Sequence, residues 1–354
     1  MRVLDGYIGR QLLLGTLMSS LVLLILLGVM NLFNELEDVG KGQYSTTAAL
    51  IYTLLTLPRY AYELFPVMVL IGSLGGLGSL AANAELTAMR SAGISLGRII
   101  GSIMRTGLLL MLAAVALGEL IAPPSEQYAQ QMRADLQAGQ ITLRSQYGFW
   151  ARDGATFINI RSILPGNQLR GIFIYEFDPQ GRLLHATQAE QASYGQGLWR
   201  LEGIRRTHLD ETGTRIELLD QADWESILDP GLLDVVVVQP HILPIWGLYR
   251  YIHFLRDNGQ QAQPYEVAFW GKLMKPLVTL AMLFLSVPFL FGSLRSVGLG
   301  RRIFVGTLIG LAFYMGNKTI AYMALVYGFN PILTALVPGL AVIGISLLAM
   351  RRVH

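Results

Sequence analysis

The sequence predicts a polytopic α-helical membrane protein, with six transmembrane helices and an all-β domain inserted between the third and the fourth. Of its 354 residues, 53% are hydrophobic and only 14% are charged, which is typical of an integral membrane protein. The apolar residues gather in blocks of about 18 or more, the length that crosses a bilayer as a helix. Residues 125–265, in the middle, have the mixed composition of a domain exposed to water.

The first three spans are expected within residues 1–124. The first apolar run is longer than the core of a signal peptide and lacks a small-residue cleavage site, so it is a retained span. Pro123 and Pro124 are expected to stop the third span sharply. The three spans cover approximately residues 11–33, 47–80 and 98–122.

A polar island at residues 80–102 separates the second span from the third. Within it, Ala82, Leu86 and Met89 recur at helical spacing and describe one apolar face. The island therefore predicts a short amphipathic helix at about residues 80–95, lying across the membrane surface. A solvated loop is the alternative that the pattern leaves open.

The inserted domain is predicted to be a β-sandwich or a jellyroll, because short alternating segments are separated by turn signals. A polar helix at residues 125–140 is expected to lead out of the membrane, and an apolar stripe predicts a helix that leads back. The strand candidates are residues 157–161, 171–177, 183–192 and 198–204, and the stripe consists of Ile245, Leu248, Tyr249, Ile252 and Leu255.

Three further spans complete the membrane part in residues 266–354, at about 266–291, 303–326 and 331–350. Arginine and lysine accumulate in short cytoplasmic loops, so their positions predict the orientation. Both termini, the polar island and residues 292–302 are expected in the cytoplasm, and the β-domain outside, because the outer hairpins then hold only Lys41. The cytoplasmic side would hold Arg2, Arg10, Arg90, Arg98, Arg295, Arg301, Arg302, Arg351 and Arg352.

Composition and motifs argue against several functional classes. The chain has no cysteine, which excludes zinc ribbons, iron–sulfur clusters and thiol nucleophiles. The net charge of +3 comes mostly from basic residues beside the spans, so no nucleic-acid surface is expected. Residues 316–319 (GNKT) lack the spacing of a phosphate-binding loop, so no nucleotide site is expected, and neither a metal site nor a catalytic residue is predicted.

Two other functional classes stand as alternatives. Residues 93–97 (GISLG) match the nucleophile elbow of a membrane-embedded serine hydrolase with Ser95 as nucleophile, although that motif needs a preceding strand and a histidine within reach. A receptor whose outer domain binds a periplasmic ligand is the second alternative. Pairs of glycines spaced by four residues are more typical of helix packing, and they are Gly72/Gly76, Gly97/Gly101 and Gly306/Gly310.

Charges inside the spans are informative, because an ion in hydrocarbon is costly and usually faces protein or a wet cavity. Arg59 and Glu63 lie four residues apart, a spacing that allows a mutual ion pair. Lys272 and Lys275 are expected to reach the membrane surface by snorkelling. Lys318 lies about 15 residues beyond the start of its span, roughly 22 Å at the helical rise, so it needs a partner.

Five stretches carry a resemblance to a known family: residues 4–10 (LDGYIGR), 83–93 (NAELTAMRSAG), 270–273 (WGKL) with Pro276, 291–296 (FGSLRS) with Gly300, and 326–328 (VYG) before Pro331. Taken together, they resemble the permeases of the lipopolysaccharide-export ABC transporter, the LptF/LptG or YjgP/YjgQ family, and most of all its LptG members. The resemblance covers essentially the whole chain.

The resemblance implies a multi-pass permease of a Gram-negative inner membrane with a periplasmic β-jellyroll. Such permeases pair as an LptF–LptG heterodimer on an LptB-type ATPase dimer, and the single-span LptC-type protein contributes a helix. They extract lipopolysaccharide and pass it to a periplasmic LptA-type bridge, a step in outer-membrane biogenesis. The resemblance also implies that ATP and Mg²⁺ bind the partner ATPase, so that this chain has no cofactor and is not an enzyme.

The resemblance also assigns candidate site residues. The polar island becomes a coupling helix held in a groove of the ATPase, with Glu85 at the position of the coupling carboxylate and Leu86, Met89 and Arg90 beside it. Spans one, two and five would line a lipid cavity. Some relatives place lysines against the lipid phosphates near the end of span one, whereas this chain departs from them with Asn31 and Asp38. The candidates for lipid contact are Lys318, Arg59, Glu63, Asn31 and Lys41.

Overall fold

Six helices of the described chain are long and apolar enough to cross a membrane, which confirms the predicted spans. They are α1 (Arg2–Leu36), α2 (Thr46–Ala82), α4 (Leu96–Ala116) with its continuation, α8 (Gln263–Phe291), α9 (Leu299–Tyr327) and α10 (Pro331–Met350). The computed structural model describes residues 2–137, 149–153, 155–164, 168–178, 180–195, 198–210, 213–224, 240–257, 259–291 and 298–351.

The third span does not stop at the two prolines, so that prediction was wrong. α4 continues through a π-helical turn (Leu117–Ile121) into α5 (Ala122–Gln137), and the Ala122 N–H bonds the carbonyl of Leu117. Pro123 and Pro124 therefore stand at the start of α5, where a missing N–H is tolerated. Proline has no N–H, so carbonyl groups of the π-turn lose a backbone donor. The Gly118 carbonyl accepts a hydrogen bond from the Lys272 ammonium of α8 instead.

Glycines allow α1 and α2 to pack backbone against backbone. A Cβ at Gly72 or Gly76 of α2 would overlap the α1 backbone around Gly15, so no larger residue fits there. This pair is a packing seam, as the sequence predicted.

The other two glycine pairs behave differently from each other. Gly306 and Gly310 bring α9 against side chains of α2, which confirms a second seam. Gly97 and Gly101 of α4 would meet nothing within 4 Å if a Cβ were added. The predicted third seam is therefore not formed within the part of the chain that the structure describes.

The inserted domain contains one antiparallel sheet of six strands, in the order β1-β2-β3-β4-β5-β6. Its buried face centres on Ile160, Ile172 and Trp199. All four strand candidates lie within β2 to β5, and β1 and β6 form the two edges. The strands are β1 (Phe149–Asp153), β2 (Thr156–Leu164), β3 (Gln168–Phe177), β4 (Leu183–Gly195), β5 (Leu198–Asp210) and β6 (Gly213–Trp224).

Two helices connect the sheet to the membrane bundle. α5 matches the expected polar helix, although its described part ends at Gln137. α7 (Ile245–Asp257) matches the expected returning helix, and its Phe254 packs against the core of the sheet. The predicted stripe needs one correction: Tyr249 is 45% exposed and Tyr251 is 3% exposed, because the buried face of α7 continues through Tyr251 onto Tyr265.

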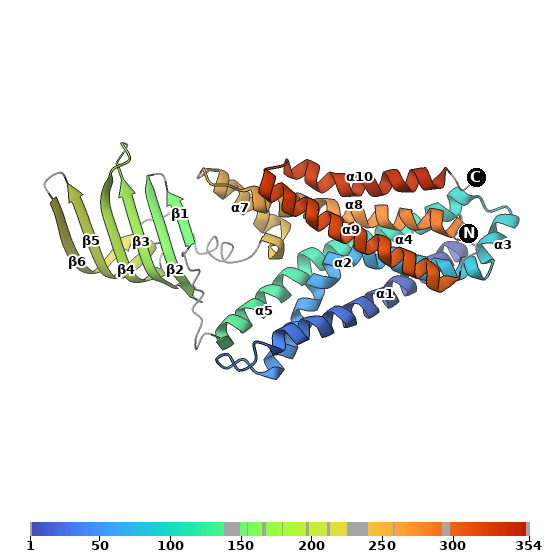
Figure 1. The fold of residues 1–354 in the computed structure, drawn as a ribbon, viewed down its shortest axis with the longest axis horizontal. Coiled ribbons are helices and arrows are strands. Elements are labelled where there is room, and N and C mark those ends of the chain that lie inside the picture. The colour runs from blue at the N-terminus through green and yellow to red at the C-terminus, as the bar shows by residue number, and fades with distance from the viewer. Residues whose placement is uncertain are drawn as a thin grey trace.

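The molecule is elongated, with the sheet at one end (Figure 1). Both ends of the chain and the short helix α3 (Glu85–Ser91) lie together at the opposite end of the helix bundle (Figure 1). Three spans before the sheet and three after it put the sheet on the opposite side of the membrane from both termini, which agrees with this arrangement. An even number of spans before and after the sheet would put all three on the same side.

Candidate functional site

Charged side chains from α2, α5 and α9 meet inside the helix bundle. The Arg59 guanidinium lies 3.5 Å from Glu63 on the same helix and 3.1 Å from Glu126 of α5. Lys318 of α9 donates a hydrogen bond to Glu63 at 3.3 Å. The expected Arg59–Glu63 pair is confirmed. Glu63 is also the partner that Lys318 was expected to need at its depth in the span. Three of the five candidates for lipid contact are thus brought together.

Lys272 and Lys275 of α8 point into the bundle, so the expectation that they snorkel to the surface was wrong. Lys272 is only 8% exposed, and its Nζ lies 3.2 Å from a carboxylate oxygen of Glu119 and 3.2 Å from the Gly118 carbonyl. The Lys275 Nζ lies 4.1 Å from the centroid of the Tyr62 ring. Both ammonium groups have acceptors or an aromatic face nearby inside the bundle, which removes the reason to reach outward.

These side chains line a cavity of about 220 Å³ between α2, α5, α8 and α9. Its remaining walls are largely apolar and include Val67, Val278 and Phe313. A cavity with apolar walls and an excess of positive charge suits an amphiphile that carries an anionic group. Four cations and two carboxylates face it: Arg59, Lys272, Lys275 and Lys318, and Glu63 and Glu126.

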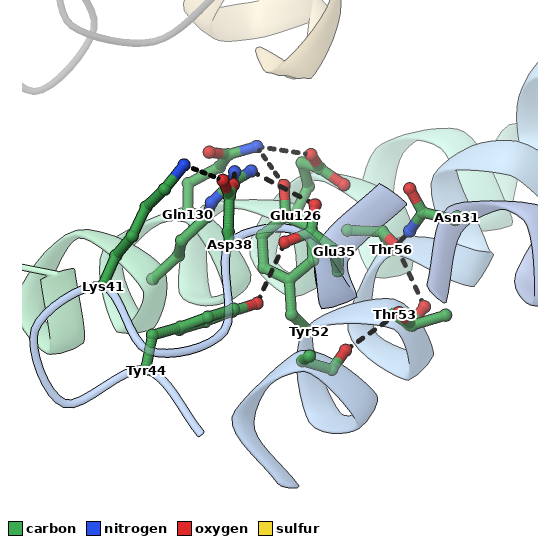
Figure 2. A network of polar contacts seen from close by, with 12 residues as sticks. Asn31, Glu35, Asp38, Lys41, Tyr44, Tyr52, Thr53, Thr56, Glu126 and Gln130 are labelled. Atoms are coloured by element: carbon green, nitrogen blue, oxygen red, sulfur yellow. Dashed lines mark hydrogen bonds and ion pairs between the residues drawn. The ribbon is translucent and has the colours of Figure 1, made fainter. Parts of the chain in front are cut away.

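Asn31 and Lys41 do not reach this cavity. They belong to a polar network that joins the ends of α1 and α2 to α5 (Figure 2). Asn31 donates to the Thr56 hydroxyl at 3.1 Å. Lys41 pairs with Asp38, which also pairs with Arg133 of α5. The Lys41 hydrogen bond, helped by Arg133, holds the pKa of Asp38 below its ordinary value, so the charge of Lys41 is already compensated.

The polar island contains a helix, but a shorter one than the sequence predicted. α2 continues as far as Ala82, so this residue does not belong to the apolar face of α3. Ala84 then takes a left-handed conformation with φ of 59°, and α3 begins at Glu85. The change of direction between the two helices therefore occurs at residues 83 and 84.

α3 is fixed to the bundle by its apolar side. Leu86 is 4% exposed, and Met89 packs against the same core cluster. Glu85 accepts a hydrogen bond from the Tyr7 hydroxyl at 2.8 Å, and Arg90 is exposed. A hollow of about 310 Å³ lies beside Leu86 and Arg90, against the end of α8. The helix thus presents Glu85 and Arg90 outward, whereas Leu86 holds it in place.

Comparison with known proteins agrees with this architecture. A sequence model of the family described as "Lipopolysaccharide export system permease LptF/LptG" matches residues 6–352. The chain belongs to the LptF/LptG family. The lipopolysaccharide export system permease protein LptG of Haemophilus influenzae is 37% identical over 342 residues, which is 95% of each chain.

Similarity within the LptF/LptG family is uneven. The LptG protein of Escherichia coli K12 is 35% identical over 356 residues, 99% of this chain and 98% of its own length. The LptF protein of the same strain is 23% identical over 181 residues, 51% of this chain and 49% of its own length. The chain is therefore more similar to these LptG proteins than to this LptF protein.

The hydrolase alternative finds no support in this LptF/LptG member. Ser95 caps the N-terminus of α4, where its hydroxyl accepts from the Arg98 N–H at 3.3 Å, and it follows helix α3 rather than a strand. The histidines with described side chains are His185 on β4, His208 on β5 and His253 on α7. The two strands belong to the sheet at the far end of the molecule from α3, and α7 lies between the sheet and the helix bundle (Figure 1). No base among them can activate the serine.

Sequence reasoning missed four members of the charged cluster, which are Glu119, Glu126, Lys272 and Lys275. The two glutamates flank Pro123 and Pro124, and the expected stop at those prolines placed Glu126 outside the membrane part. A usable signal was present: the residues after the prolines keep a helical composition, and the glutamates lie on both sides of the junction.

Proposed function

We propose that this chain is an LptG-type permease subunit of a lipopolysaccharide export system in a Gram-negative inner membrane. The observation that carries the proposal is the nearly full-length similarity to two LptG proteins, against a partial match to LptF. The six spans and the inserted sheet support a subunit that conducts lipid from the bilayer toward the space on the sheet's side.

The proposed orientation places the termini and α3 in the cytoplasm and the sheet in the periplasm. Its support is the concentration of arginines at the end of the bundle that holds α3. At that end, Glu85 and Arg90 would contact an LptB-type ATPase dimer, while Leu86 and Met89 anchor the coupling helix. ATP and Mg²⁺ would bind that ATPase, and this chain would hold no cofactor.

The other proposed partners are an LptF-type permease, an LptC-type single-span protein and an LptA-type bridge. Within the membrane, Lys318, Arg59 and Glu63 would contact the lipid. The Lys318 side chain supports this role, since it is 46% exposed although it already pairs with Glu63. Asn31 and Lys41 would lie at the edge of the lipid path, because the polar network of Figure 2 occupies their polar groups.

Affinity purification from membranes tests the assignment. A tagged chain, extracted in mild detergent, should bring down an LptF-type permease, an ATPase and lipopolysaccharide, which mass spectrometry can identify. Proteoliposomes containing this complex should release lipopolysaccharide to a periplasmic bridge protein in an ATP-dependent manner. A stable complex that hydrolyses ATP but releases no lipopolysaccharide would refute the proposal.

Two variants separate lipid contact from a structural ion pair at Lys318. If the lysine contacts lipid, Lys318→Ala should reduce photocrosslinking of lipopolysaccharide while the complex assembles normally, and Lys318→Arg should retain crosslinking. If Lys318→Ala instead dissociates the complex, and adding Glu63→Gln restores it, the lysine is structural and leaves the site.

A further inference from the structure

Aromatic side chains form a continuous row on the exposed side of α7. The Trp246 and Tyr249 rings stack with their centroids 5.8 Å apart, and the centroids of Tyr249 and His253 are 4.4 Å apart. Trp246 is 68% exposed and Tyr249 is 45% exposed, although the opposite side of the helix is buried against protein. α7 therefore presents an aromatic surface that the described residues of this chain leave largely uncovered.

This row is continuous with an exposed apolar stripe of α8. The centroids of Tyr249 and Phe269 are 6.4 Å apart, and Phe269 meets Trp270 edge to face at 5.6 Å. Leu273 and Leu277 follow Trp270 at helical spacing, and they are 41% and 54% exposed. Because α8 is one of the spans, these exposed leucines face hydrocarbon. The aromatic row of α7 thus begins where the lipid-facing stripe of α8 ends.

The length of α8 puts this contact near the edge of the membrane. The helix has 29 residues, which is about 43 Å at the helical rise, whereas a hydrocarbon core is about 30 Å thick. Phe269 and Trp270 lie roughly 9–10 Å from the start of α8 at Gln263, near the place where the core begins. Tryptophan and tyrosine gather at this depth, because their rings have an apolar body and a polar tip. α7 lies at the same end of the bundle, beside the sheet (Figure 1).

The charge beside the aromatic row suits the surface of a bilayer. Arg250 follows Tyr249, is exposed, and enters none of the ion pairs formed among the described residues. Arg256 is compensated, since its guanidinium lies 2.8 Å from Glu266 of α8. The exposed carboxylate of Asp257 lies at the end of the helix, about 10 Å along the axis from Arg250. A guanidinium in this place can reach lipid phosphates while its stem lies along apolar surface.

We propose that α7 is an interfacial helix whose aromatic row lies in the head-group layer of a phospholipid bilayer. Such helices bury one side about 5–10 Å into the boundary between head groups and acyl chains. Phe254 of the same helix packs against the core of the sheet, so this anchor holds the sheet at a fixed height above the membrane. The anchor needs only a phospholipid surface and is separate from the proposed transport of lipopolysaccharide.

Fluorescence quenching measures the depth of α7 in the full chain, reconstituted in nanodiscs of phosphatidylethanolamine and phosphatidylglycerol. The chain has no cysteine, so His253→Cys supplies a single site for a nitrobenzoxadiazole label at the end of the row. A nitroxide on the lipid head group should quench this label strongly, and a nitroxide at the end of the acyl chain should not. The matched control is a label at Ile216→Cys, an exposed position of the sheet, which neither lipid should quench.

Two variants test whether the aromatic row causes this depth. Replacing Trp246 and Tyr249 together by serine should reduce head-group quenching of the label at position 253 at least about twofold, because the rings no longer hold the helix at the boundary. Trp150→Ser, which removes an exposed tryptophan of β1, should leave the quenching unchanged. Absence of head-group quenching in the chain with its aromatic row intact would overturn the proposal, and so would unchanged quenching in the double variant. If the double variant does not fold, the quenching pattern of the intact row decides.

Photocrosslinking identifies what covers the row in the assembled complex. Benzoylphenylalanine in place of Tyr249 keeps an aromatic ring at that position, and the tagged chain is irradiated in membranes and then purified with its partners. A phospholipid adduct on this chain, detected by mass spectrometry, is the expected result. An adduct with another protein subunit would show that the row is a protein interface, and no adduct would show that it faces water; either result overturns the proposal.

Discussion

Replacement of Lys272 by methionine should destabilise the junction between the membrane bundle and the sheet. The Lys272 ammonium bonds both the Glu119 carboxylate and the Gly118 carbonyl, each at 3.2 Å. The other oxygen of Glu119 accepts from the Ile245 N–H, at the start of α7, at 2.7 Å. One lysine therefore ties α8 to the π-turn, and Glu119 ties the π-turn to the helix that packs on the sheet.

The magnitude follows from burial. Removing one partner of a buried ion pair typically costs about 3–5 kcal/mol, because the other charge is left uncompensated. The Glu119 side chain is 21% exposed and keeps the Ile245 N–H, so the lower end applies and we expect about 3 kcal/mol for Lys272→Met. At about 2 °C per kcal/mol for a large domain, the unfolding midpoint should fall by roughly 6 °C.

A double-mutant cycle measures the pair. Glu119→Gln keeps an oxygen that can accept from Ile245 but loses the charge, so Glu119→Gln with Lys272→Met should be more stable than the two single effects predict. Thermal unfolding of the purified complex in detergent, followed by tryptophan fluorescence, gives the midpoints. Arg256→Met is the matched control, since its pair with Glu266 also joins α7 to α8 but the arginine is 63% exposed. Additive single effects, or a Lys272→Met shift no larger than that of Arg256→Met, would refute the reasoning.

Three further outcomes are expected. Gly76→Ala should lower the yield of folded protein by driving α1 away from α2, an overpacking cost of about 1–3 kcal/mol, whereas Gly101→Ala should leave the yield unchanged; equal yields would contradict the seam. Glu85→Lys should leave the protein inserted in the membrane but weaken ATPase association or uncouple ATP hydrolysis from lipid release. Co-purification of the ATPase and a transport assay measure these two effects. Normal transport by the variant would remove Glu85 from the coupling site. The Arg182 N–H and guanidinium hold the pKa of Asp178 below its ordinary value, so the β3–β4 turn should be stable above about pH 4 and open as pH falls through the lowered pKa. Hydrogen exchange at Gly181 reports this opening, and Asp178→Asn should flatten its pH dependence.

The parts of the fold that depend on local pattern could be predicted from the sequence. Apolar blocks of membrane length fixed the number of spans, and alternating segments located β2 to β5. The edge strand β6 was not predicted because its burial does not alternate: its residues are mostly exposed, and Ile216 and Leu218 are 61% and 73% exposed. The other edge strand, β1, was not predicted either. Alternation signals a strand only where one face is covered.

The helix junction failed for a reason that is also physical. A proline pair is a stop signal when a regular i→i−4 ladder must continue through it. Here the π-turn changes the hydrogen-bond register immediately before Pro123, and a lysine from another helix takes the free carbonyl of Gly118. The device that lets the helix continue is therefore tertiary, and no local propensity encodes it.

The charged cluster shows where reasoning from depth reaches its limit. The depth of Lys318 in its span predicted that it needs a partner, and the structure shows that this partner is Glu63. For Lys272 and Lys275 the same reasoning predicted that the side chains extend to the membrane surface, since a long side chain near the end of a span can reach water. The choice between water and an interior partner depends on which helices are neighbours, and α8 lies against both α2 and the π-turn. That adjacency puts the Tyr62 ring beside Lys275 and the Glu119 carboxylate beside Lys272. Intramembrane charges can thus be recognised as significant from sequence, but their assignment to a site requires the order in which the helices pack.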